Sequence, residues 1–166
     1  MRSLVFVLLG LLSLRVSPSA QDSPGPAPTV ACDVTVRQRD DGFYATPALG
    51  VWLSEDGTIV FRPGGPGFIA PDGSLSMKFP WQRRIRGALT IEGRRLDGAA
   101  PPLRSAIPDG YGDTGFQATA LIFPTPGCWE VTGRVGGERL TFVTRVVKVD
   151  AAVDSSSGDW RLPAMR

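Results

Sequence analysis

The stretch from Gly115 to Val149 reads GFQATALIFPTPGCWEVTGRVGGERLTFVTRVVKV and decides the fold. It predicts three consecutive strands, and it carries Cys128, the second of two cysteines. Within it, Val135-Gly136-Gly137-Glu138 is typical of a two-residue hairpin, because Gly-Gly supplies the positive φ that a type I′ turn needs. The chain is therefore expected to fold around a hairpin near its C-terminal end.

The residues on either side of this turn alternate between two faces, which is the period of a strand. Before the turn, one face takes Trp129, Val131 and Val135, and the other takes Glu130, Thr132 and Arg134. After the turn, one face takes Leu140, Phe142 and Val146, and the other takes Val143, Val147 and Val149. Apolar residues on both faces predict that the second strand is central in its sheet or covered on both sides.

Residues 1–20 have the features of a secretory signal peptide. A basic start at Arg2 precedes an apolar run from Leu4 to Leu14, and Ser17–Ala20 offers small residues for cleavage. The run is shorter than the roughly 20 apolar residues that a membrane span needs. A lipoprotein signal ending at Cys32 is disfavoured, because the cysteine lies too far from the apolar run. We therefore expect a secreted or periplasmic protein with no integral membrane segment after cleavage.

The remainder divides into three parts. Residues 21–31 form a Pro-rich linker, residues 32–149 form one folded domain, and residues 150–166 lose all periodicity and are expected to be a disordered tail.

The charge of the chain argues against a nucleic-acid partner. The sequence has 18 basic and 16 acidic residues, and Arg2 and Arg15 leave with the signal peptide, so the mature chain has no net charge. Nucleic-acid binding would need a basic surface, and none is expected at the level of the whole domain. Arginine greatly outnumbers lysine, and asparagine and histidine are absent, which indicates a GC-rich bacterial source.

Two cysteines in an exported chain predict one disulfide, Cys32 to Cys128. With no histidine and both cysteines oxidised, zinc and copper lack ligands, so no metal or cofactor is expected. Calcium needs six or more oxygen ligands, and the best candidate, Asp109–Asp113, is better explained as an acidic turn.

The rest of the folded region also predicts strands. Residues 32–37 alternate and predict a first strand, and residues 50–54 and 58–62 flank Glu55-Asp56-Gly57 and predict a hairpin. Residues 75–81 and 87–92 predict two more strands, and the Pro-rich segment 99–111 is long enough to cross from one sheet to another. About seven short strands with Gly and Pro turns predict an all-β antiparallel sandwich.

The corner Phe123-Pro124-Thr125-Pro126-Gly127, followed by the alternating strand Cys128–Gly133 and a hairpin, resembles the last two strands of immunoglobulin-like (Ig-like) domains. The wider pattern resembles small secreted bacterial Ig-like proteins of unknown function, and segments 72–81, 93–97 and 107–112 share in the likeness. The resemblance implies a single Ig-like antiparallel β-sandwich and no established activity. Cys128 begins a strand beside Trp129, unlike the Tyr-x-Cys of antibody domains, so the disulfide is expected to staple an end of the sandwich.

No catalytic residues are expected. Without histidine a nucleophile lacks its usual base, and Ser76 and Lys78 share a strand face by default. The carboxylate pairs Asp40-Asp41 and Glu55-Asp56 adjoin glycine, where aspartate is favoured for turn formation. A hydrolase is the remotest of the alternatives.

The segment Lys78–Arg104 is the one candidate binding surface. It is basic and aromatic, a combination that suits anionic, planar or sugar-bearing ligands and protein interfaces. The candidate residues are Phe79, Trp81, Arg83, Arg84 and Arg86, with Tyr111 from the following loop. In the competing interpretation Phe79 and Trp81 cap the core, and the arginines are solvated or paired with acids. The protein is thus expected to be a non-enzymatic module that binds a protein or cell-envelope component, or a structural domain without a ligand site.

Overall fold

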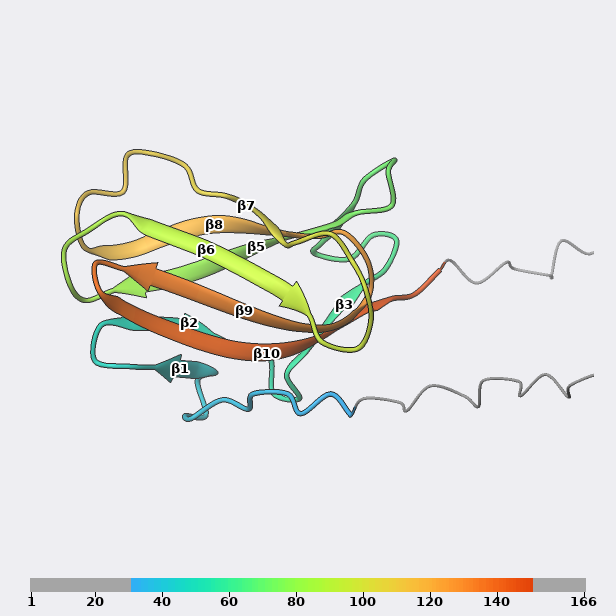
Figure 1. The fold of residues 1–166 in the computed structure, drawn as a ribbon, viewed down its shortest axis with the longest axis horizontal. Coiled ribbons are helices and arrows are strands. Elements are labelled where there is room, and N and C mark those ends of the chain that lie inside the picture. The colour runs from blue at the N-terminus through green and yellow to red at the C-terminus, as the bar shows by residue number, and fades with distance from the viewer. Residues whose placement is uncertain (1–30, 151–166) are drawn as a thin grey trace, which may run out of the picture.

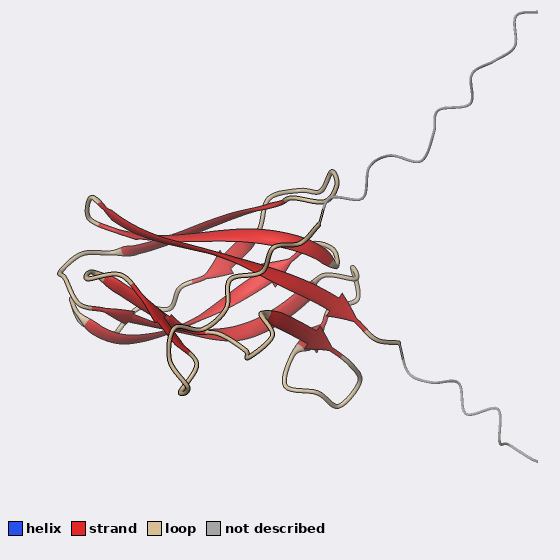
Figure 2. Cartoon of the chain, turned by 90° about the horizontal axis from the view of Figure 1, so that it is seen from below, coloured by secondary structure: helices blue, strands red, loops and turns tan. Residues whose placement is uncertain are grey.

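In a computed structural model, which describes residues 31–150, the chain forms two β-sheets packed face to face, with no helix in this range. Figures 1 and 2 show the two layers of strands. The all-β prediction is confirmed. The predicted signal peptide, nearly all of the linker and nearly all of the tail lie outside the described residues. Residues 31–150 contain no long apolar helix of the kind that crosses a membrane.

The first sheet has the order β1-β2-β5-β8-β7, with the short β4 also pairing with β5, and the second has the order β3-β10-β9-β6. The strands are β1 (Phe43–Ala45), β2 (Leu49–Trp52), β3 (Thr58–Phe61), β4 (Phe68–Ile69), β5 (Leu75–Arg83), β6 (Leu89–Arg95), β7 (Arg104–Ala106), β8 (Gly115–Phe123), β9 (Gly127–Val135) and β10 (Glu138–Lys148). The chain passes from β6 in the second sheet to β7 in the first within the Pro-rich segment, which confirms the predicted crossing, but residues 104–106 of the segment form β7 itself.

The core lies between the sheets and is built from alternate residues of the long strands. β5 contributes Leu75, Phe79 and Trp81, and the facing β10 contributes Leu140, Phe142 and Val146. The Phe79 and Phe142 rings stack with their centroids 5.3 Å apart.

The β9–β10 hairpin forms at the predicted position. Glu138 pairs with Val135, which leaves Gly136 and Gly137 as the two-residue loop. Only Gly136 has a positive φ, 58°, so the turn fits type II′ and not the predicted type I′. The faces of both strands follow the predicted alternation.

β10 is central, as its apolar residues on both faces predicted. It pairs with β9 along one edge and with β3 along the other. The β3 pairing is parallel, with Arg145 opposite Thr58 and Lys148 opposite Phe61, so the second sheet is mixed and the all-antiparallel prediction is wrong for this pair.

The predicted hairpin of residues 50–54 and 58–62 does not form. β2 pairs with β1 and β5 in one sheet, and β3 pairs with β10 in the other. The turn at Gly57 exists, with φ 63°, but it docks on β10: the Gly57 carbonyl accepts hydrogen bonds from the Arg145 amide (3.0 Å) and the Thr144 hydroxyl (2.8 Å). The turn therefore passes the chain between sheets.

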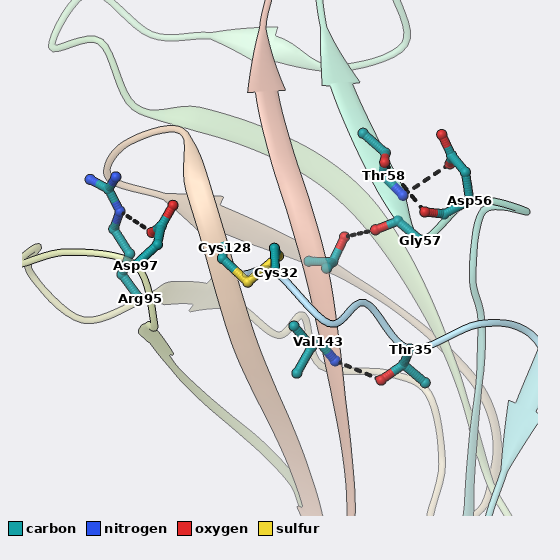
Figure 3. The surroundings of a disulfide bond; sticks show 10 residues. Cys32, Thr35, Asp56, Gly57, Thr58, Arg95, Asp97, Cys128 and Val143 are labelled. Carbon is teal, nitrogen blue, oxygen red and sulfur yellow. Dashed lines mark hydrogen bonds and ion pairs between the residues drawn. A yellow bond between two sulfur atoms is a disulfide. The ribbon is translucent and has the colours of Figure 1, made fainter. Parts of the chain in front are cut away.

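The segment 32–37, predicted as a strand, is not a regular strand. Its start is bonded to β9 by the Cys32–Cys128 disulfide (S–S 2.08 Å), and the segment then crosses the outer face of β10 (Figure 3). On the far side the Thr35 amide donates to the Val143 carbonyl (2.8 Å), and the Val143 amide donates to the Thr35 hydroxyl (2.9 Å). A chain that crosses its neighbour cannot form a ladder with it, which explains the difference. The disulfide staples the outside of the second sheet and does not join the two sheets.

Replacing both cysteines by serine should lower the free energy of unfolding by up to about 4–5 kcal/mol, the chain-entropy value for a loop of this length. The linked residues are 96 apart in sequence. Urea denaturation with and without reductant measures the loss. Reductant should destabilise the parent and leave the double variant unchanged; equal stability of parent and variant under oxidising conditions would contradict the assignment.

Gly133 on β9 faces Trp81 so closely that a Cβ there would lie 2.3 Å from the indole ring. Gly133→Ala should therefore cost about 1–3 kcal/mol of stability through overpacking. Gly137→Ala is the matched control, because nothing lies within 4 Å of a Cβ at Gly137. Chemical denaturation of the two variants decides the matter, and equal midpoints would show that the Gly133–Trp81 contact is unimportant.

Candidate functional site

Phe79 and Trp81 lie in the core. Trp81 is fully buried and Phe79 is 6% exposed, because both point inward from β5. They fill the space between the sheets, as the competing interpretation of the sequence expected, and the fully buried Trp81 is out of reach of a partner in this structure.

Most arginines of the Lys78–Arg104 segment are paired with acidic side chains. The pairs are Arg86–Asp113 (3.9 Å), Arg94–Glu130 (2.8 Å), Arg95–Asp97 (2.7 Å) and Arg104–Asp72 (3.5 Å). The Arg95–Asp97 pair lies beside the disulfide (Figure 3). The acidic partners of these four arginines come from several elements. The excess of basic residues in this segment of the sequence therefore does not form a continuous basic surface.

Arg83 and Tyr111 meet at one end of the sandwich. The Arg83 side chain is buried (4% exposed) and has no carboxylate within 4 Å among the described residues. Its guanidinium donates instead to the carbonyls of Gly87 (2.9 Å), Tyr111 (2.9 Å) and Gly112 (2.7 Å). Arg83 therefore fixes the loop between β7 and β8, which walls a cavity of about 450 Å³.

The same hydrogen bonds occupy part of the loop Asp109–Asp113, the candidate calcium site. Two backbone oxygens of that loop already accept hydrogen bonds from the Arg83 cation. No group of three acidic or cysteine side chains suited to a metal ion occurs within residues 31–150.

Arg83→Met should destabilise the fold by about 2–4 kcal/mol, because three backbone carbonyls lose a buried charged donor. Amide exchange in residues 107–114 should also accelerate. Arg86→Met is the control, since Arg86 is exposed and its ion pair is long. If the two variants unfold at the same denaturant concentration, Arg83 does not hold the loop.

The carboxyl groups with shifted pKa values belong to turns. The backbone amide of Thr58 lowers the pKa of Asp56, and the hydroxyl and amide of Ser74 lower that of Asp72. Partial burial opposes the shift at Asp97, but the hydrogen bonds from Arg95 and the Cys128 amide lower its pKa overall. Each remains an ionised acceptor near neutral pH, as turn aspartates do.

A gap in the hydrogen-bond ladder interrupts the edge of β5. β4 pairs with Leu75 and Ser76, and β2 pairs with Trp81, Gln82 and Arg83, so no strand pairs with this edge at residues 77–80. The Ser74 carbonyl accepts from Ala70 and the Arg84 amide donates to Ala48, which shows that even-numbered residues face this edge. Because backbone direction alternates along a strand, the Lys78 amide and carbonyl and the Pro80 carbonyl face the gap.

Pro80 explains why the ladder breaks here. Proline has no N–H, so a strand beside it loses one ladder bond, and proline in sheets is confined to edges and bulges. β8 pairs along the whole other edge of β5, including Ala118 opposite Pro80.

A groove of about 510 Å³ lies along this gap, and we call it the edge groove. It is lined by Trp52, Ser54, Thr58, Ile59, Val60, Arg62, Pro66, Met77, Lys78, Phe79 and Pro80. Its only charged members are Arg62 and Lys78, both exposed, and neither has an ion-pair partner within the part of the chain that the structure describes. The edge groove is therefore apolar and cationic, with no carboxylate in its lining.

An aromatic cluster continues this surface. Trp52, 36% exposed, packs against Phe43 with ring centroids 4.9 Å apart. The Arg84 guanidinium lies 5.4 Å from the centre of the Phe43 ring, a cation–π distance. Of the predicted surface, Phe79 is thus part of the groove lining, and Arg84 lies beside the aromatic cluster that continues it.

Trp52, Arg62 and the pairing gap were not predicted from the sequence. One sequence signal could have placed Lys78 and Pro80 correctly. Apolar residues alternate along β5 at Leu75, Met77, Phe79 and Trp81, which directs these side chains inward and leaves Lys78 and Pro80 on the outer face.

Fold and groove together define an all-β, two-sheet protein with one disulfide and an interrupted strand edge. The sequence matches no protein-family model, and no curated protein matches it either.

Proposed function

We propose that this protein is an exported, non-enzymatic Ig-like module that binds a protein or cell-envelope component through the edge groove. The apolar run from Leu4 to Leu14 and the disulfide support export. Two packed sheets and the β9–β10 hairpin after a Pro-Gly corner support the Ig-like class, although the disulfide lies outside the inter-sheet core.

One observation carries the binding function: two cations without carboxylate partners flank an unpaired strand edge in an apolar groove. Surface cations are usually solvated or paired, and strand edges are usually covered or blunted. The arginines of β6 and β7, at the opposite edges of the two sheets, are paired, whereas the exposed Arg139 and Arg145 of β10 also have no carboxylate partner among the described residues. The edge groove is therefore distinguished by the combination of unpaired cations with an unpaired strand edge. An anionic partner with apolar contacts would satisfy both features of the groove at once.

The test is affinity capture from envelope extracts with the parent and two double variants. Arg62→Ala with Lys78→Ala removes the two groove cations, and loss of charge complementarity should reduce capture of a specific partner at least tenfold. Arg94→Ala with Arg134→Ala is the control, because it removes the same charge from the outer face of the second sheet.

Circular dichroism and thermal unfolding verify that both variants are folded. If the groove variant captures everything that the parent captures, the edge groove is not the binding site. In that case the structural or accessory role, without a discrete ligand, is the better account.

A further inference from the structure

We propose that the partner enters the edge groove as an extended, acidic peptide segment, which adds to β5 as an antiparallel strand between β4 and β2. This inference rests on the proposed binding function and specifies the form and charge of the bound segment.

The backbone of β5 supplies the first argument. The gap offers one donor, the Lys78 amide, and two acceptors, the carbonyls of Lys78 and Pro80. The unpaired stretch Met77–Pro80 is about 13 Å long at the rise of a strand, which accommodates about four residues of a peptide. Peptide addition to an exposed strand edge uses main-chain groups of this kind for affinity and neighbouring pockets for specificity.

The neighbours of the gap set the direction of the added strand. β4 and β2 both run antiparallel to β5, and they lie on the same edge at the two ends of the gap. A segment in the same direction continues their ladder. Because Pro80 has no N–H, the segment gains three hydrogen bonds here and not four, so side-chain contacts must contribute to the affinity.

The charge of the groove sets the chemistry of the segment. Arg62 and Lys78 are its only charged members, and Trp52, Val60 and Pro66 give it exposed apolar walls. Alternate side chains of an extended peptide point to opposite sides. Acidic residues alternating with apolar ones would therefore place carboxylates toward the cations and apolar side chains toward the walls.

A second copy of this chain is a poorer occupant. The strands at the sheet edges are β1, β3, β6 and β7, and only β6 carries a carboxylate, Glu92, which is already paired with Arg134 and shares its strand with two arginines. The charge of the groove thus favours a segment from a different protein.

The experiment uses a random octapeptide library displayed on phage, panned against the oxidised full domain. The selected peptides should be enriched in Asp and Glu at alternate positions. A synthetic selected peptide should slow exchange of the Lys78 amide at least tenfold by NMR. The variant Arg62→Glu with Lys78→Glu should weaken binding of that peptide at least tenfold, and Arg94→Glu with Arg134→Glu should leave it unchanged.

Three results with peptides would overturn the proposal: failure to select any peptide, selection of peptides without acidic residues, or binding that leaves Lys78 amide exchange unchanged. Protection of the Lys78 amide without peptide, with dimers in sedimentation velocity, would assign the groove to a second copy and would also overturn it. If envelope capture depends on Arg62 and Lys78 while no peptide protects the Lys78 amide, the binding function stands and strand addition fails.

Discussion

The pairing of β10 along both of its edges is the constraint on which the rest of the structure depends. One edge holds β9 through the Gly136-Gly137 hairpin, and the other holds β3. Where β3 has not yet begun, Thr35 takes its place beside Val143, and the turn at Gly57 docks on the same edge (Figure 3). The inner face of the strand meets Phe79 and Trp81 of the opposite sheet. A single strand near the C-terminal end therefore organises segments from the whole described chain.

The parts of the fold that the sequence predicted are those set by local chemistry. A Gly-Gly pair between alternating segments produces a hairpin whatever the rest of the chain does, and the β9–β10 pairing followed. The failures concern distant partners. The turn at Glu55-Asp56-Gly57 was correctly located, but a turn does not determine whether its flanking strands pair with each other or with longer strands elsewhere. Here the docking of Gly57 on Thr144 and Arg145 directs β3 to β10.

For the candidate site, too, local sequence patterns were informative and the contacts between distant segments were not. Composition pointed to the Lys78–Arg104 segment, and its first three residues, Lys78, Phe79 and Pro80, do line the edge groove. The segment's aromatic residues are buried and most of its arginines are paired, because which side chain faces an acid depends on strand register across the sheets. Arg62 and Trp52 come to line the groove only because the chain leaves the first sheet after β2 and joins the second sheet at β3. No local sequence pattern predicts that the chain changes sheet at this point, although Pro80 lies where the ladder on β5 is interrupted.

The position of the disulfide also orders events during synthesis. The ribosome releases Cys32 well before its partner Cys128, which lies 96 residues later. At ordinary translation rates that interval is about 5–20 s. Throughout it the first thiol has no native partner, and strands β1 to β8 have all emerged before the bond becomes possible. The covalent link therefore cannot form until every strand of the first sheet has been released, but it becomes possible before β10 is, so the second sheet is still incomplete at that moment.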